Sequence, residues 1–145
     1  MKFVMLVGFP GAGKSTIAKE YQKQGYAIHS PDAIRNELNM HEDGQIGEVL
    51  DIMHSRMFED MKQGKNIIYD STNLSCRRRM KVLRSIKQFN YEKICIIVST
   101  PLSVCKERNS HRIGYSKVTD EGYNIMQQVY KRPTLDEGWD IIKEE

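Results

Sequence analysis

The segment Gly8–Thr16 constrains the possible folds of this chain more strongly than any other feature. It reads Gly-Phe-Pro-Gly-Ala-Gly-Lys-Ser-Thr and fits the pattern G-x-x-x-x-G-K-[ST], between an apolar run, Lys2–Val7, and a helical run, Ser15–Gln24. A loop in that position turns on its glycines, and its backbone N–H groups and the positive end of the helix dipole face bound phosphates. The pattern predicts a polyphosphate-binding loop (P-loop, or Walker A motif) made by Gly8, Phe9, Pro10, Gly11, Ala12, Gly13, Lys14, Ser15 and Thr16.

The P-loop also supplies two side chains that act on a nucleoside triphosphate. Lys14 can reach the β- and γ-phosphates, and the hydroxyl of Ser15 can ligate Mg²⁺. The alternative, a glycine-rich turn with a surface lysine, does not account for the strand and the helix that flank the motif. We therefore expect ATP and Mg²⁺ as cofactors and transfer of the terminal phosphoryl group.

Four short apolar runs rich in β-branched residues alternate with helix-length segments. This alternation predicts parallel strands that helices cover on both faces, at Lys2–Val7, Tyr26–His29, Asn66–Tyr69 and Lys93–Ser99. Helices are expected at Ser15–Gln24, Ser75–Phe89, Leu102–Asn109 and Thr119–Tyr130. Apolar residues at three- and four-residue steps predict a further amphipathic helix that ends near Gly64. This stripe consists of Ile46, Val49, Leu50, Met53, Met57 and Met61. Its methionines are assigned to the core.

These elements define the expected fold class, which is α/β. We expect a three-layer P-loop NTPase kinase fold with a parallel sheet of about four strands flanked by helices. One domain is expected over residues 1–145, because the chain is too short for two full domains. The polar segment His111–Lys117 is predicted to be a mobile loop between two helices, within a small helical lid at about residues 105–120.

Composition limits the classes of protein to which the chain can belong. The 22 basic and 19 acidic residues give a net charge of +3, which permits an anionic substrate without requiring one. Cys76, Cys95 and Cys105 contain no C-x-x-C pair, which argues against a disulfide framework or a zinc site and favours a reducing, cytoplasmic location. No segment is expected to span a membrane. The sequence leaves open whether copies of the chain form a homo-oligomer. The last predicted helix has an apolar face that could serve as the contact, with Tyr123, Ile125, Met126 and Tyr130.

Asp32 and Arg35 follow the second predicted strand and are three residues apart. Pro31 suits the first position of a helix with Ser30 as its cap, so the two charged residues share a helix face at the carboxyl edge of the sheet. Ligands of open α/β sheets bind at that edge. A carboxylate there can accept the proton of an attacking hydroxyl, and a guanidinium can hold a phosphate of the acceptor. The alternative is that Asp32 only favours the helix start and that Arg35 pairs with it on the surface.

Three further charged residues could belong to the same site. Asp70 ends the third predicted strand, as the Walker B carboxylate that supports hydrated Mg²⁺ does, although Asp-Ser-Thr-Asn is also a turn and cap sequence. Arg108 and Arg112 are four residues apart at the edge of the predicted loop. Guanidinium groups can neutralise the charge that spreads over the phosphates in a transition state, whereas a solvated pair on a helix is the alternative.

The most basic stretch is Arg77-Arg78-Arg79 with Lys81 and Arg84. Three consecutive arginines cannot all face the core, so at least two of them are expected to be solvated. They could follow a nucleic-acid backbone, or they could form a plain charged helix face. Few aromatic rings lie near them in the sequence for base stacking. Both interpretations stay open at this point.

Together these residues resemble the kinase domain of the polynucleotide 5′-hydroxyl kinase family, in particular the phage enzyme and the kinase halves of kinase–phosphatase repair proteins. The resemblance covers most of the chain. The P-loop occurs in very many proteins, whereas the Arg-Asn-x-x-Arg and Pro-Thr-Leu-x-Glu-Gly stretches are more discriminating. The matching segments are the P-loop, Asp32–Arg35, Asp70–Leu74, Arg77–Arg78, Lys106–Arg112 and Pro133–Trp139.

The resemblance implies roles on both sides of a transferred phosphoryl group. It implies that Asp32 is the general base that deprotonates a 5′-hydroxyl and that Arg35 holds the adjoining 3′-phosphate of the acceptor. On the donor side it implies that Lys14 and Ser15 hold the triphosphate and the magnesium ion. It also implies that Arg112 is the lid arginine on the donor phosphates. Arg108 corresponds to its companion, which lines the nucleotide site.

The resemblance also implies that the segment after the third strand contributes to the site. Asp70 corresponds to the carboxylate near the metal, and Thr72 and Asn73 to acceptor-binding positions. In the phage enzyme the acidic residue stands one position later, where this chain has Ser71. Either Asp70 or Ser71 could therefore occupy the metal-side position.

The sequence leads to the hypothesis that the γ-phosphate of ATP is transferred to the 5′-hydroxyl end of a nucleic acid. The Asp-x-Asp motif of the phosphatase domain in the bifunctional relatives is absent, so the resemblance is to the kinase half alone. A small-molecule, sugar-nucleotide or tRNA P-loop kinase is an alternative. An ATP-binding switch module without phosphotransfer is an alternative of another class. The sequence leaves open DNA or RNA, a single strand or a duplex end, and the range of donor nucleotides.

Overall fold

A five-stranded parallel sheet lies at the centre of the computed structural model, which describes residues 1–145. The strand order is β2-β3-β1-β4-β5, and every neighbouring pair is parallel. The strands are β1 (Lys2–Val7), β2 (Ala27–His29), β3 (Ile67–Tyr69), β4 (Glu92–Ile97) and β5 (Ile141–Glu144). The first four strands were predicted, but the expected count of about four is wrong by one. The edge strand β5 has only two apolar residues, Ile141 and Ile142, before its charged end, and this is too short a run to stand out in the sequence.

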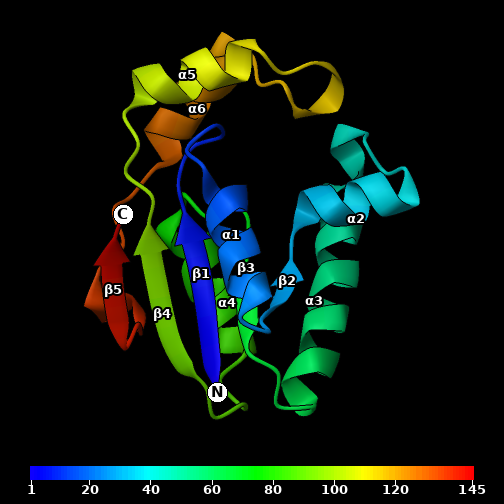
Figure 1. Cartoon of the computed structure of the whole chain (residues 1–145), viewed down its shortest axis with the longest axis vertical. Coiled ribbons are helices and arrows are strands. Elements are labelled where there is room, and N and C mark those ends of the chain that lie inside the picture. Colours follow the sequence, from blue (N-terminus) through cyan, green and yellow to red (C-terminus); the bar gives the residue numbers. More distant parts are fainter.

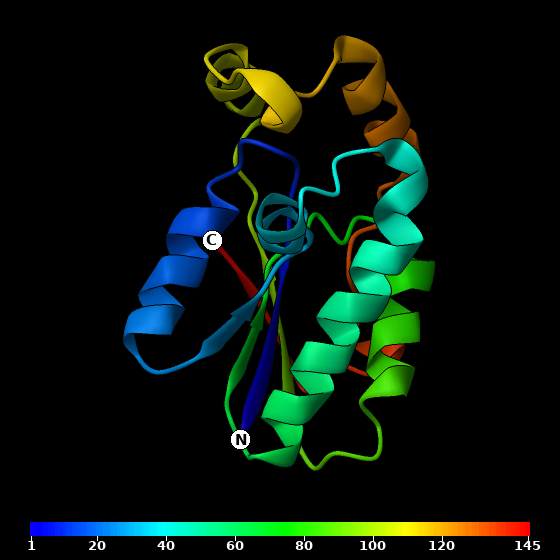
Figure 2. The ribbon, with the colours of Figure 1, turned by 90° about the vertical axis from the view of Figure 1, so that its right-hand side faces the viewer.

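Helices cover both faces of this sheet (Figures 1 and 2). Alternate residues of β1 point to opposite sides, so Phe3 and Met5 pack into one apolar cluster while Val4 and Leu6 pack into the other. The first cluster also contains residues of α2 (Pro31–Leu38), α3 (Ile46–Lys62) and α4 (Cys76–Ser85). The second contains residues of α1 (Lys14–Lys23), α5 (Leu102–Ser110) and α6 (Asp120–Val129). The structure therefore confirms the three-layer α/β prediction.

Helix α2 begins at the cap that the sequence predicted. The hydroxyl of Ser30 accepts a hydrogen bond from the backbone N–H of Ala33 (3.3 Å), and Pro31 occupies the first turn of α2. Ser75 caps α4 in the same way, and this helix ends at Ser85 instead of the predicted Phe89. Short 3₁₀ turns at Asp43–Gln45, Gly114–Ser116 and Leu135–Glu137 were not predicted.

The methionines of the α3 stripe face the core, as predicted. Met53, Met57 and Met61 are each at most 2% exposed. Cys95 is also completely buried, in agreement with its assignment to the core. The apolar residues of α6 do not form the single exposed face that the sequence suggested. Tyr123 is completely buried, whereas Ile125 is 54% exposed. Tyr123 therefore cannot form part of a surface contact between copies of the chain.

Two helices close the carboxyl edge of the sheet. In Figure 1, α5 and α6 lie above the ends of β1 and β4, and the segment between them reaches toward α2. Parallel strands place everything that follows them at this one edge, so segments far apart in the sequence meet there. None of the helices is both long enough and apolar enough to cross a lipid bilayer.

Candidate active site

A cavity of about 850 Å³ lies at the carboxyl edge of the sheet. Its walls are formed by the segments that follow β1, β2, β3 and β4, together with the region around α5 and α6. Most of the predicted site residues line this cavity: Pro10, Gly11, Ala12, Gly13, Lys14, Ser15, Thr16, Asp32, Arg35, Asp70, Thr72, Arg108 and Arg112. The fold therefore brings together residues that are up to about 100 positions apart.

The P-loop conformation depends on its glycines and on the helices above it. Gly11 and Gly13 have φ angles of +87° and +99°, which side chains other than glycine rarely adopt. A Cβ atom on Gly11 would overlap the carbonyl oxygen of Cys105 in α5. The buried hydroxyl of Tyr123 donates a hydrogen bond to the carbonyl oxygen of Pro10 (2.7 Å). The loop is thereby attached to both α5 and α6.

Lys14 stands at the first position of α1, and its ammonium group donates to the carbonyl oxygen of Phe9 (2.9 Å). Burial lowers the pKa of Lys14 to about 8, and the nearby positive charge of Arg112 acts in the same direction. Asp70 and Asp32 oppose this shift because their negative charges stabilise the ammonium form. The electrostatic environment of Lys14 therefore includes charged groups from α2, from the end of β3 and from the segment after α5.

A hydroxyl and a carboxylate meet beside the P-loop. The hydroxyl of Ser15 donates to a carboxylate oxygen of Asp70 over 3.5 Å. Burial raises the pKa of Asp70, as does the charge of Asp32, while Lys14 and the hydrogen bond from Ser15 act against the shift. These oxygen donors suit Mg²⁺, which binds proteins through few direct ligands and takes the rest from water and phosphates. The two residues fit a magnesium ion at this position, and Ser71 lines the cavity without a side-chain hydrogen bond to Ser15.

Asp32 and Arg35 line the same cavity from α2. They are not paired with each other: the guanidinium of Arg35 donates to the carbonyl oxygens of Met40 (2.7 Å) and Glu42 (3.1 Å). The carboxylate of Asp32 is exposed and accepts no hydrogen bond from the protein. The surface ion pair that was the alternative for these two residues is therefore absent. An unpaired carboxylate in a cavity can accept a proton from a bound hydroxyl.

Arg108 and Arg112 enter the cavity from the end of α5 and the segment after it. Arg108 donates to the carbonyl oxygen of Gly11 (3.1 Å), and Arg112 donates to that of Ser116 (3.3 Å). In the same segment, the ring of Tyr115 stacks on the ring of His41 with centroids 4.0 Å apart and planes 6° apart. This contact joins the α5–α6 connection to the segment after α2. Both arginines thus stand in the cavity at the P-loop, and neither forms an ion pair.

The structure leaves three of the predicted residues outside the cavity lining. Gly8 and Phe9 belong to the loop, but they support it from behind: Gly8 N–H donates to the carbonyl oxygen of Thr72 (3.0 Å), and the ring of Phe9 packs on that of Tyr130. Asn73 is buried, and its side-chain amide donates to the carbonyl oxygen of Leu6 (2.7 Å). We therefore remove Asn73 from the predicted acceptor site, because its amide is committed to the backbone of β1.

Sequence reasoning missed several residues of the cavity wall. Ile46 and Leu50 belong to the stripe of α3, for which only the methionines were assigned a place, and Arg78 belongs to the basic stretch whose role was left open. Tyr115 lies in the segment that was predicted as a mobile loop within the lid, and no role was assigned to this residue. The sequence shows that these residues are apolar, basic or polar. Its periodicity and charge pattern do not show which of them face the cavity.

Comparisons with known proteins match this architecture. Residues 3–133 match the protein family AAA_33, described as AAA domain. The chain is 22% identical over 147 residues to a bifunctional polynucleotide phosphatase/kinase of Schizosaccharomyces pombe, with 99% of this chain and 33% of the relative covered. It is 23% identical over 144 residues to an L-seryl-tRNA(Sec) kinase of Methanococcus maripaludis, with coverages of 95% and 56%. The chain thus spans about a third and a little over half of the length of these two curated relatives.

A solved structure gives the same fold. The APS kinase of Mycobacterium tuberculosis in complex with AMPPNP and APS superimposes with a TM-score of 0.64 at 19% identity, with 99% of this chain and 87% of that one covered. AMPPNP, which that structure contains, is an analogue of ATP. At this identity the comparison shows the shared fold.

Proposed function

Because the chain belongs to the AAA domain family AAA_33 and has the fold of a P-loop kinase, we propose that it transfers the γ-phosphate of ATP to the 5′-hydroxyl end of a nucleic acid. The observation that carries this proposal is the shared cavity of Lys14 and Asp32. One residue belongs to a loop built for phosphates, and the other is an unpaired carboxylate on the neighbouring helix α2. A donor phosphate and an acceptor hydroxyl can meet between them.

The donor half of the site holds the triphosphate. The backbone N–H groups of the P-loop and the ammonium group of Lys14 bind the β- and γ-phosphates. Ser15 and Asp70 would hold a hydrated magnesium ion, which would neutralise charge on the phosphate oxygens. Arg108 and Arg112 supply two more positive charges to the cavity. They stabilise the negative charge that spreads over the transferring group.

The acceptor half of the site lies on α2. Arg35 is held in place by the carbonyl oxygens of Met40 and Glu42, so its guanidinium is fixed before the substrate binds. Its remaining donors can hold the phosphate on the 3′ side of the acceptor nucleotide. The carboxylate of Asp32 takes the proton of the 5′-hydroxyl, the oxygen bonds to the γ-phosphorus, and the bond from that phosphorus to the β–γ bridging oxygen breaks. ADP leaves, and the new 5′-phosphate keeps the transferred group.

Two of the relatives support different acceptors, so the acceptor class needs its own evidence. The named activities of the relatives include phosphorylation of polynucleotides and of a seryl-tRNA. The unpaired Asp32 and the fixed Arg35 argue against a nucleotide-dependent switch, because a switch needs no acceptor clamp. They favour an acceptor that carries both a hydroxyl and a neighbouring phosphate, which a nucleic-acid end provides.

The test is a transfer assay with [γ-³²P]ATP and a panel of acceptors. The panel contains a 5′-hydroxyl oligodeoxynucleotide, a 5′-hydroxyl oligoribonucleotide, a nucleoside 3′-monophosphate, the matching nucleoside and a seryl-tRNA. We expect label on the first three acceptors, and loss of label when the oligonucleotide already carries a 5′-phosphate. Label on the seryl-tRNA alone, or ATP binding without transfer to any acceptor, would contradict the proposal.

A variant of Arg35 tests phosphate binding by this residue separately from the transfer step. Arg35→Ala is expected to raise the KM for the nucleoside 3′-monophosphate by about tenfold or more, since a hydrogen bond to a charged group contributes about 1.5–3 kcal/mol. The same change is expected to have little effect on the unphosphorylated nucleoside. Equal effects on both acceptors would remove Arg35 from the phosphate-binding role.

A further inference from the structure

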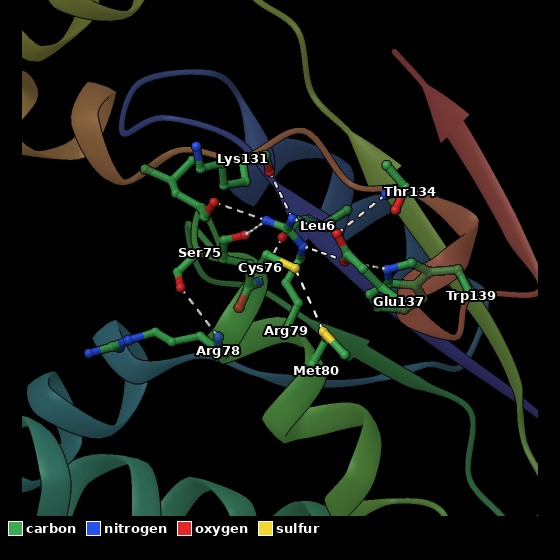
Figure 3. A network of polar contacts seen from close by, with 12 residues as sticks. Leu6, Ser75, Cys76, Arg78, Arg79, Met80, Lys131, Thr134, Glu137 and Trp139 are labelled. Atoms are coloured by element: carbon green, nitrogen blue, oxygen red, sulfur yellow. Dashed lines mark hydrogen bonds and ion pairs between the residues drawn. The ribbon is translucent and has the colours of Figure 1, made fainter.

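The basic residues of α4 divide into two groups with different environments. Arg79 is completely buried and donates to both carboxylate oxygens of Glu137, at 2.8 and 2.9 Å. It also donates to the backbone carbonyl oxygens of Asn73, Leu74 and Lys131, at 2.7 to 3.0 Å (Figure 3). All of its hydrogen-bonding capacity is used inside the fold, so Arg79 has a structural role.

The other four basic residues of this stretch are exposed and unpaired. Arg77, Arg78, Lys81 and Arg84 form no ion pair and no side-chain hydrogen bond within the protein. Arg77 and Arg78 are adjacent, and Lys81 and Arg84 follow at steps of three residues, so the four side chains spread over one broad side of the helix. Figure 3 shows the side chain of Arg78 extended away from the network around Arg79. We refer to Arg77, Arg78, Lys81 and Arg84 as the α4 basic surface.

This surface forms a depression without a counter-charge. A hollow of about 520 Å³ is lined only by Ser75 and the α4 basic surface, so no acidic and no apolar side chain contributes to it. Four neighbouring positive charges repel one another, and a bound polyanion removes that repulsion. The composition of the hollow therefore fits phosphate groups, and it does not fit an apolar ligand.

The α4 basic surface is continuous with the candidate active site. Arg78 lines both the hollow on α4 and the large cavity that contains Lys14 and Asp32. Helix α4 also covers the same face of the sheet as α2, which carries Asp32 and Arg35. A chain of phosphates that begins at Arg35 can therefore continue past Arg78 onto α4.

We propose that the α4 basic surface binds the sugar–phosphate backbone of a nucleic-acid strand on the 3′ side of its accepting 5′-hydroxyl. The inference rests on the proposed function and extends it from the terminal nucleotide to the strand behind it. Exposed lysine and arginine side chains bind nucleic acid by displacing counterions from the phosphates. The hollow has no aromatic ring on which bases could stack, so this part of the strand is bound without reading its sequence.

The proposal predicts that acceptor length matters. A nucleoside 3′-monophosphate reaches only the active-site cavity, whereas an oligonucleotide of about ten residues also covers α4. We expect the kcat/KM for the oligonucleotide to exceed that for the mononucleotide by about tenfold or more. For a single strand each phosphate contact contributes about 0.7 to the slope of log K against log salt concentration, so three contacts contribute about 2.

The test uses a triple variant, Arg77→Glu/Lys81→Glu/Arg84→Glu. It leaves Arg78 and all other residues of the active-site cavity unchanged. The matched control is Lys2→Glu/Lys19→Glu/Lys23→Glu, which changes the net charge by the same amount at exposed positions away from α4. Binding is measured by fluorescence anisotropy with a 3′-labelled 5′-hydroxyl DNA 10-mer and its RNA counterpart, and transfer is measured with the 10-mers and the nucleoside 3′-monophosphate.

We expect the α4 variant to bind the 10-mers at least tenfold more weakly, with a salt slope smaller by about 2. Its transfer to the nucleoside 3′-monophosphate is expected to stay within about twofold of the wild type. Unchanged binding of the 10-mers by the α4 variant, or an equal loss in the control variant, would overturn the proposal.

The same data separate this inference from the proposed function. Transfer to mononucleotides without any gain from length overturns the role of α4 and leaves the proposed kinase activity standing. Binding of the 10-mers that depends on α4, together with no transfer to any 5′-hydroxyl, supports the surface as a nucleic-acid site and contradicts the proposed activity.

Discussion

The hydroxyl of Ser15 donates to a carboxylate oxygen of Asp70 across 3.5 Å, and this contact joins the first turn of α1 to the end of β3. The two residues are 55 positions apart in the sequence. The sequence left two candidates, Asp70 and Ser71, for the residue on the metal side. The contact with Ser15 favours Asp70. A magnesium ion held here would lie beside Lys14, whose charge acts on the pKa of Asp70.

The first prediction concerns the magnesium requirement. Asp70→Asn removes the negative charge that supports the hydrated ion, so the Mg²⁺ concentration for half-maximal transfer is expected to rise by about 10- to 100-fold. Ser71→Ala is the matched control and should leave the requirement within about twofold of the wild type. A magnesium titration of the initial transfer rate measures both variants. The reverse order of effects would assign the metal-side position to Ser71.

The second prediction concerns the pH dependence of ATP binding. Burial lowers the pKa of Lys14 to about 8, so the free protein loses this positive charge as the pH rises above that value. Bound phosphates stabilise the ammonium form, and binding above pH 8 must therefore take up a proton. The Kd for ATP is expected to increase about tenfold between pH 7.5 and pH 9.

Isothermal titration calorimetry in buffers with different ionisation enthalpies measures this proton uptake directly. Lys14→Met has no titrating group at this position, so its weaker binding should vary little over the same pH range. A wild-type protein whose Kd for ATP does not change between these pH values would contradict the link between Lys14 and the phosphates.

The third prediction concerns the backbone of the P-loop. Gly11→Ala places a side chain at a φ of +87° and against the carbonyl oxygen of Cys105. The left-handed conformation alone costs about 1–3 kcal/mol, so we expect a lower Tm and at least a tenfold loss of ATP affinity. Gly47→Ala is the control, because Gly47 lies in α3 with open space around it. It should leave ATP binding unchanged and, as a helix position, should not lower the Tm. Equal Tm values for the two variants would contradict this account of the loop.

The fourth prediction concerns the buried ion pair of Arg79 and Glu137, whose side chains are 0% and 4% exposed. Arg79→Met leaves the carboxylate buried without its partner and is expected to lower the free energy of unfolding by about 3–5 kcal/mol. The double variant Arg79→Met/Glu137→Leu removes both charges and should lose less. Urea denaturation at pH 7 measures the two variants. A larger loss in the double variant would contradict the assignment of Arg79 to the fold.

The same ion pair makes the free energy of unfolding depend on pH in the acidic range. Burial by itself raises the pKa of Glu137, but the hydrogen bonds from Arg79 and Trp139 outweigh burial and hold it below its usual value. A lowered carboxyl pKa contributes stability that is present above the unfolded-state pKa of about 4.3 and is lost as the pH falls below it. The wild type should therefore lose more stability between pH 5 and pH 3 than Arg79→Met does.

Local patterns predicted much of the fold. The P-loop follows from a motif whose glycines and flanking elements are contiguous, and β1 was predicted with the bounds that it has in the structure, Lys2–Val7. The meeting of the P-loop with α2 also followed from the sequence, because parallel strands bring their carboxyl ends to one edge. These features depend on chain order and periodicity, which a single sequence contains.

The features that sequence reasoning missed depend on contacts between distant residues. The sequence could not tell which of three consecutive arginines is buried, because that depends on Glu137, 58 positions after Arg79. The side-chain amide of Asn73 is used on the backbone of β1, 67 positions earlier, and this removed it from the predicted acceptor site. Strand β5 pairs with β4 although its own pattern is short and charged.

The central claim is that Asp32 activates an acceptor hydroxyl opposite the P-loop, and single-turnover transfer by Asp32→Asn tests it most directly. The variant keeps the shape of the side chain, so the Kd for ATP should stay within about twofold of the wild type. The rate of transfer to a 5′-hydroxyl oligonucleotide is predicted to fall by about 10²–10⁴-fold, which is the usual contribution of a positioned general base. A transfer rate close to that of the wild type, with ATP bound normally, would contradict the account.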